Sequence, residues 1–252
     1  MLWSKNGILW KLTAKMKVVI SSGCSFTDTA WANTWPVHLV KYYPTAQHIK
    51  SGLSASGNGL ISRKIIYEVT EALKTHKPKD ILVGVMWSGR DRHDVYLSDP
   101  PKFEHNSGWR SNPTRFIKSS SNHWTLLNWY WENDFAKQYF TQYHDNIGSQ
   151  IYTIEHVLRI QWFLQLHQIP YFMSTFTDEV FDKGMINHID VDHLYEQIDF
   201  THFLPVKGEH EWARDHSGLP FAQHDAMHPT EDQHKMFVDE VIVPYLKTKN
   251  YL

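Results

Sequence analysis

Two short segments at opposite ends of the chain carry residue types that together could perform acyl transfer. A serine becomes a strong nucleophile when a base takes its proton and an acid orients that base. Ser25 stands in Gly23-Cys24-Ser25, and Asp225 and His228 stand three residues apart near the C-terminus. At that spacing the carboxylate can reach one imidazole nitrogen and leave the other facing a serine. The sequence therefore predicts Ser25 as nucleophile, His228 as base and Asp225 as orienting acid, although each segment alone also fits a simple turn or helix cap.

A third segment could supply an oxyanion hole. Gly57 lies between Ser56 and Asn58, and a glycine lets a backbone N–H approach a substrate oxygen closely. Gly57 is therefore a candidate oxyanion donor. A turn in which Asn58 caps the following helix explains the same residues, and both interpretations can hold together.

Alternating strand and helix patterns would position these segments. Apolar β-branched runs predict strands, and apolar residues at helical spacing predict the helices between them. Such alternation is typical of a parallel sheet with helices on both faces, so the fold class is α/β, a three-layer α/β/α domain with about five strands. The carboxyl ends of its strands share one edge, where sites form. The predicted strands are 17–21, 46–50, 80–87 and 169–176, and the predicted helices 31–43, 58–76, 145–167 and 230–246.

The order of these segments resembles the SGNH, or GDSL-like, hydrolases. Ser25 matches the serine of that family's first block, Gly57 the glycine of its second, and Asp225 and His228 its terminal Asp-x-x-His. The resemblance implies a flavodoxin-like architecture and a serine esterase that uses no metal or other cofactor. In it, the backbone N–H groups of Ser25 and Gly57 would stabilise the oxyanion.

Two departures from the family pattern affect the predicted site. Cys24 replaces the family's Asp in the first block and is a rival nucleophile, although its side chain should point away from that of Ser25. The third block, Gly-x-Asn-Asp in the family, here reads Trp87-Ser88-Gly89-Arg90-Asp91. Counting from the strand end places Arg90 at the position of the donor Asn, and Ser88 is a second candidate. Arg90 could equally bind a substrate anion or pair with Asp91.

The sequence predicts hydrolysis of a small-molecule or carbohydrate ester, with an O-acetyl group on a carbohydrate as the first candidate. That candidate rests on an aromatic segment whose rings could stack on sugars or simply pack an insertion: Trp124, Trp129, Tyr130 and Trp131. Two alternatives remain. One is a binding or structural protein that keeps the fold without turnover. The other is a metal-dependent hydrolase using His188, Asp190, Asp192 and His193, three of which would share one face of an extended segment.

Composition bounds the remaining possibilities. The length of 252 residues suits an N-terminal extension, 1–15, followed by one domain, 16–252, with an aromatic-rich insertion at about 90–134. The formal net charge is −2. That charge balance predicts no nucleic-acid partner. We expect no membrane partner, since no apolar run reaches the roughly 18 residues of a membrane span and no signal peptide is evident. A single cysteine excludes an internal disulfide, which fits a cytoplasmic protein. The sequence carries no signal for oligomeric state.

Overall fold

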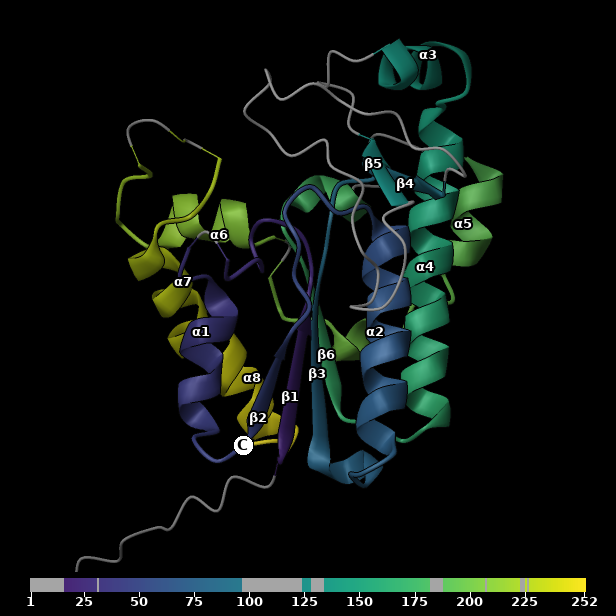
Figure 1. Cartoon of the computed structure of the whole chain (residues 1–252). Helices are drawn as coiled ribbons and strands as arrows, with labels where there is room; N and C mark the ends of the chain where they lie inside the picture. The colour runs from purple at the N-terminus through teal and green to yellow at the C-terminus, as the bar shows by residue number, and fades with distance from the viewer. Residues whose placement is uncertain are drawn as a thin grey trace, which may run out of the picture.

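A four-stranded parallel sheet forms the centre of the fold. The computed structural model describes residues 16–30, 32–96, 124–127, 134–181, 188–206, 208–222, 225 and 227–252. Within these ranges the strand order is β2-β1-β3-β6 (Figure 1). The strands are β1 (Val18–Ser22), β2 (Gln47–Lys50), β3 (Ile81–Trp87) and β6 (Tyr171–Thr175). An isolated parallel bridge between Met173 and Phe203 adds one further residue pair beside β6.

The burial of the strands explains their sequence pattern. Every residue of β1, β3 and β6 is buried, whereas the edge strand β2 is partly exposed. Continuous apolar runs are expected where helices cover both faces of a parallel sheet. The three inner strands therefore could be read from sequence as buried strands, and all four predicted strands are confirmed.

Helices cover both faces of the sheet (Figure 1). Helices α2 (Asn58–Leu73) and α4 (Asn146–Leu166) lie on one face. Helices α1 (Trp35–Leu39), α7 (Glu231–Phe237) and α8 (Val243–Thr248) lie on the other. The fold is thus a three-layer α/β/α arrangement, as predicted. Single turns of 3-10 helix lie at Val40–Tyr42, Pro78–Asp80, Asp178–Phe181 and Phe200–His202.

The C-terminal helix starts directly after the Asp225–His228 segment. Thr230 and Gln233 form a reciprocal capping box that satisfies backbone donors of the first turn. The helix continues from α7 through a π turn, Val238–Ile242, into α8. Pro244 follows that turn, and its missing N–H is one reason for the irregular hydrogen bonding there.

Short regular elements lie in two further stretches, one in and after the predicted insertion and one between β6 and Asp225. Strands β4 (His93–Tyr96) and β5 (Trp124–Leu127) pair antiparallel above the carboxyl edge of the main sheet (Figure 1). Helix α3 (Asp134–Gln142) follows, and α5 (Ile189–Tyr195) and α6 (Glu209–His216) lie in the second stretch. Elements this short show no sustained periodicity, which is why the sequence did not predict them. The predicted extension 1–15 and much of the predicted insertion lie outside the described residues.

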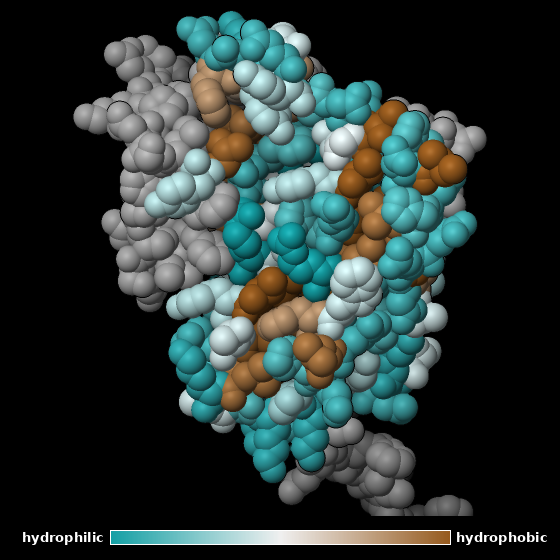
Figure 2. All heavy atoms as spheres, turned by 90° about the vertical axis from the view of Figure 1, so that its right-hand side faces the viewer, coloured by the Kyte–Doolittle hydropathy of each residue, from teal (hydrophilic) through white to brown (hydrophobic). Residues whose placement is uncertain are grey.

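Helices α4 and α5 form the face that Figure 2 shows, where apolar side chains gather in patches between hydrophilic ones. Exposed apolar residues on these two helices are Trp162, Leu166 and Ile189. Among the described residues, no helix has both the length and the apolar character that crossing a bilayer requires.

Candidate active site

The carboxyl ends of all four strands open onto one cavity of about 610 Å³. Each strand is followed by a loop that contributes to its wall, as expected for an open parallel sheet. Most of the wall is apolar, with charged groups at a few places. The lining residues used below are Ser25 and Phe26 after β1, Ser54 and Ala55 after β2, Arg90, Asp91 and Arg92 after β3, Phe176 and Glu179 after β6, and Met227 and His228 before α7.

Ser25 lies in a tight turn at the end of β1. The backbone N–H groups of Thr27 and Asp28 both donate to the carbonyl of Cys24, at 2.9 and 3.0 Å. This turn brings Ser25 to the cavity wall. The side chain of Cys24 is fully buried in the hydrophobic core, and burial in apolar surroundings makes a thiol a poor nucleophile.

Hydrogen bonds connect Ser25, His228 and Asp225 in one chain. The Nε2 of His228 lies 2.8 Å from the Ser25 Oγ, and its Nδ1 lies 2.7 Å from the Asp225 Oδ2. The other carboxylate oxygen accepts from the backbone N–H groups of Met227 and His228, at 3.0 and 3.1 Å. A carboxylate held this way accepts from Nδ1–H, which leaves Nε2 as the acceptor for the serine hydroxyl. The structure thus brings together the three residues predicted from the two terminal segments.

The surroundings favour a neutral imidazole next to a charged carboxylate. Burial lowers the pKa of His228 below its usual value, Asp225 opposes this, and the charges of Arg92 and His234 lower it further. Burial alone would raise the pKa of Asp225, but His228 and the two backbone donors outweigh it and hold that pKa below its ordinary value. A neutral histidine paired with a carboxylate is the state in which imidazole can accept a proton.

The described residues that line the cavity do not include Gly57, Asn58 or Ser88. The Asn58 amide joins α2 to the end of β3: it accepts from the Ser88 N–H at 2.8 Å and donates to the Ser88 carbonyl at 3.0 Å. A side chain at Gly57 would overlap the backbone carbonyl of Arg92. These residues therefore fix the loop after β3, and a donor role toward substrate stays a prediction.

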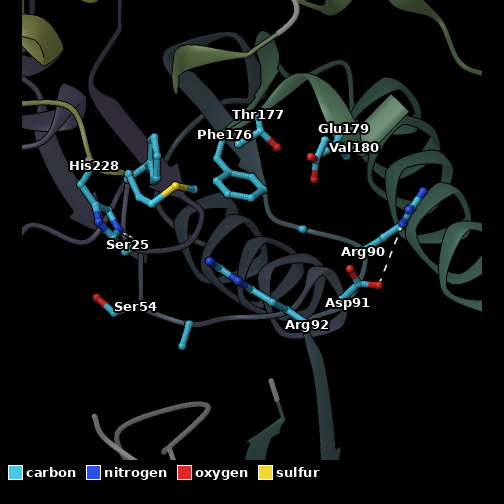
Figure 3. A pocket seen from close by; sticks show the side chains of 14 residues that line it. Ser25, Ser54, Arg90, Asp91, Arg92, Phe176, Thr177, Glu179, Val180 and His228 are labelled. Atoms are coloured by element: carbon cyan, nitrogen blue, oxygen red, sulfur yellow. Dashed lines mark hydrogen bonds and ion pairs between the residues drawn. The ribbon is translucent and has the colours of Figure 1, made fainter. Parts of the chain in front are cut away.

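Counting residues from the end of β3 predicted that Arg90 faces Ser25. In the structure the arginine that extends toward Ser25 is Arg92. Arg90 points toward the far end of the cavity, where its Nε lies 3.9 Å from the Asp91 carboxylate (Figure 3). Arg92 extends across the cavity toward His228 and Ser25. Its N–H closes a turn onto the Gly89 carbonyl, 3.2 Å away, before β4 begins. Because this turn reverses the chain, counting residues from the strand could not identify which side chain faces the serine.

The loop after β2 contains positioning residues that the sequence did not single out. Asp28 accepts from the backbone N–H and the hydroxyl of Ser54, at 2.9 and 2.8 Å, and so ties this loop to the turn of Ser25. A β-carbon on Gly52 would lie 2.6 Å from the Thr27 carbonyl oxygen. Gly52 lies two residues after the predicted strand, nearer its end than Gly57, and this proximity was the available signal.

The other predicted segments lie apart from this cavity or outside the described residues. His188 caps helix α5, which begins at Ile189, so the extended face predicted for His188, Asp190 and Asp192 is wrong. The His188 Nδ1 accepts from the Asp190 N–H, and Asp190 and Asp192 lie in the first turn, where the helix dipole favours acids. Across the ranges that the structure describes, no three His, Cys, Asp or Glu side chains are grouped as they would be to hold a metal. Trp129, Tyr130 and Trp131 fall outside those ranges, as does the side chain of Trp124.

Comparisons with known proteins give a family for the whole fold. No curated protein matches the chain. A solved structure, "Structure of a putative lipolytic protein of G-D-S-L family from Desulfitobacterium hafniense DCB-2", is similar at a TM-score of 0.47 and 11% identity, covering 94% of this chain and 99% of that one. The model of one protein family matches residues 20–251. The chain therefore belongs to the family described as "Family of unknown function (DUF6071)".

Proposed function

We propose that this protein is an SGNH-type serine hydrolase that cleaves an ester bond. The observation that carries the proposal is the hydrogen-bonded chain from Ser25 through His228 to Asp225, with contacts of 2.8 and 2.7 Å. Its position at the carboxyl edge of a parallel sheet, on a cavity large enough for a small substrate, supports the same proposal.

The proposed reaction has two steps. The Nε2 of His228 takes the proton of Ser25 as the Oγ attacks the acyl carbon, and Asp225 stabilises the imidazolium that forms. In this proposal the Ser25 backbone N–H donates to the reacting oxygen, where negative charge develops. His228 then protonates the leaving alcohol, the acyl group stays on Ser25, and a water activated by His228 releases the acid.

The acyl group and the alcohol define the finer part of the proposal. An O-acetylated carbohydrate is one candidate, and its support is the aromatic segment around Trp129 in the sequence. Release of acetate from acetylated sugars, compared with release from simple alkyl acetates, tests that candidate. A rate independent of the sugar would remove carbohydrate recognition from the proposal.

Active-site labelling tests the proposed nucleophile without knowledge of the substrate. A fluorophosphonate should label the native protein, and the adduct should map to Ser25 by peptide mass spectrometry. Ser25→Ala should abolish labelling, while Cys24→Ala should keep it, because the Cys24 thiol is enclosed in the core. Unlabelled native protein without turnover of any ester would instead favour the binding or structural alternative.

A further inference from the structure

Arg92 places a positive charge in the body of the proposed substrate cavity. Its guanidinium carbon lies 5.1 Å from the centre of the Phe176 ring, and its Nη1 donates to the Ser88 Oγ at 3.1 Å. Figure 3 shows the side chain extending across the cavity, with the Phe176 ring on one side. The Phe176 ring and the Ser88 hydroxyl hold the guanidinium in place and leave other N–H groups for a ligand.

Arg92 differs from the neighbouring Arg90 in its charged partners among the described residues. Arg90, two residues earlier, has Asp91 beside it, and Asp91 also accepts from His144 at 3.1 Å. Among the described residues, no carboxylate lies within ion-pair distance of Arg92, whose hydrogen-bond partner is the neutral Ser88. The acidic Glu179 lines the same cavity at the end occupied by Arg90 (Figure 3). At the end of the cavity near Ser25, the Asp225 carboxylate already accepts from His228 and from two backbone N–H groups, so it does not pair with Arg92.

The positive charge of Arg92, which has no ion-pair partner among the described residues, is unfavourable for the proposed chemistry. The first step converts His228 into an imidazolium, and the charge of Arg92 opposes that protonation. An anion bound to Arg92 would remove the opposition and restore the basicity of the imidazole. The residues of the site thus point to a negatively charged group that arrives with the substrate.

We propose that Arg92 is a substrate-binding residue that selects esters carrying a carboxylate near the scissile bond. The inference rests on the proposed function and names its substrate class. The planar guanidinium fork matches a carboxylate bidentately. A carboxylate is preferred to a doubly charged phosphate, because Arg90 is already next to Asp91 and one guanidinium balances one negative charge. The apolar wall formed by Phe26, Phe176 and Met227 suits the hydrocarbon part of such an ester.

The oxyanion formed at the reacting carbonyl is the competing counter-ion for Arg92. It arises from every ester, whether neutral or charged, so a donor to the oxyanion would accelerate both kinds equally. A substrate carboxylate exists only in the charged ester. Paired esters that differ only in this group therefore separate the two roles.

The test uses three pairs of 4-nitrophenyl esters of equal chain length. The neutral members are butyrate, valerate and hexanoate, and the charged members are the monoesters of succinic, glutaric and adipic acid, each corrected for spontaneous hydrolysis. We expect the native protein to prefer at least one charged ester by about tenfold to a hundredfold in kcat/KM, the size of one charge-assisted hydrogen bond. A native protein that prefers the neutral member of every pair would overturn the inference.

Variants of Arg92 then assign the preference to the guanidinium. Arg92→Gln should remove the preference by lowering kcat/KM for the charged ester only, and Arg92→Lys should restore part of it. Arg214→Gln is the matched control, because Arg214 is an exposed arginine paired with Asp215 on α6. An equal loss on neutral and charged esters in Arg92→Gln would make Arg92 an oxyanion donor and contradict the inference. Thermal melting checks that each variant is folded.

Failure of the proposed function gives a different result from failure of this inference. If the native protein hydrolyses no ester and fluorophosphonate does not label Ser25, the proposed hydrolase function fails. Calorimetric titration with monomethyl adipate, which carries one carboxylate, and with the neutral methyl hexanoate then tests Arg92 by itself. Binding of monomethyl adipate that is at least tenfold tighter than that of methyl hexanoate, and lost in Arg92→Gln, supports the carboxylate site. Equal binding, or no binding of either compound, overturns it.

Discussion

Two carboxylate–histidine pairs with the same contact distance lie next to Phe26. In one, Asp225 meets the Nδ1 of His228 at 2.7 Å, and in the other Glu209 meets the Nδ1 of His234 at 2.7 Å. Both imidazole rings contact Phe26, with ring centres 5.1 and 6.3 Å away. The pairs differ in what surrounds the second ring nitrogen and in their exposure to solvent.

The difference decides which pair could perform chemistry. The Nε2 of His228 faces the Ser25 hydroxyl at the cavity wall. The side chains of Glu209 and His234 are almost completely buried, and the His234 Nε2 has no partner among the described residues. A carboxylate beside a histidine is therefore not a catalytic site by itself. What distinguishes the Asp225 pair is a serine hydroxyl within hydrogen-bond reach of the histidine and an opening to the cavity.

The largest expected effect is a loss of turnover when Ser25 or His228 is changed. Ser25→Ala and His228→Ala should each lower kcat by about a thousandfold or more, and the double variant should be little worse, because the residues act as a unit. Kinetics on an ester that the native protein hydrolyses measure this. His234→Phe, if folded, should lose far less activity. Comparable losses in His228→Ala and His234→Phe would erase the distinction between the pairs.

Breaking the Glu209–His234 pair should lower the free energy of unfolding. Glu209→Ala leaves the His234 imidazole buried without its acceptor, and breaking a buried pair costs about 3–5 kcal/mol of unfolding free energy. Asp225→Ala should cost much less stability, since its side chain is 28% exposed and water can replace it. Urea unfolding of both variants measures the contrast. Glu209→Gln, which keeps an acceptor, should lie between native and Glu209→Ala.

The sequence predicts the Asp225–His228 pair but not the Glu209–His234 pair, and the reason is geometric. Asp225 and His228 lie three residues apart, so one turn of chain brings them together. Glu209 and His234 lie on separate helices, α6 and α7, and meet only through packing. No local pattern encodes that contact.

The same reasoning explains the loop after β3. The strands and the three-layer fold could be predicted, because burial on both faces imposes long apolar runs. The direction of Arg90 and Arg92 depends on a turn between Gly89 and Arg92 and on the packing of Gly57 against the Arg92 carbonyl. Both depend on contacts across the fold. Residue type was therefore predictable at this site, whereas side-chain direction was not.

Phe26 offers a way to disturb both pairs at once with a smaller effect. Its ring contacts both imidazoles and packs against Phe176, with ring centres 5.4 Å apart. Phe26→Leu keeps an apolar side chain but loses these ring contacts, so we expect a loss of about 1–2 kcal/mol in unfolding free energy. The rate should fall only several-fold, because Ser25 and His228 keep their hydrogen bond. A thousandfold loss of rate would mean that the ring itself positions His228.

The smallest expected effect is a displacement of the pH profile of kcat/KM. It tests whether the charge of Arg92 acts on His228. His228 must be neutral to accept the serine proton, so kcat/KM should fall as pH drops through its pKa. Burial, Arg92 and His234 lower that pKa and Asp225 raises it, with a net decrease. The acidic limb should therefore lie below the usual pKa of an imidazole.

Arg92→Gln removes a cation that disfavours the imidazolium, which raises the pKa of His228 and moves the limb to higher pH. The displacement is measured on a neutral ester, so that substrate binding by Arg92 does not contribute. The displacement should shrink as salt is added, because the cavity is open to solvent. An unchanged limb in Arg92→Gln would mean that the charge of Arg92 is screened from His228, and the electrostatic reason for a substrate anion would then be lost even if Arg92 still bound one.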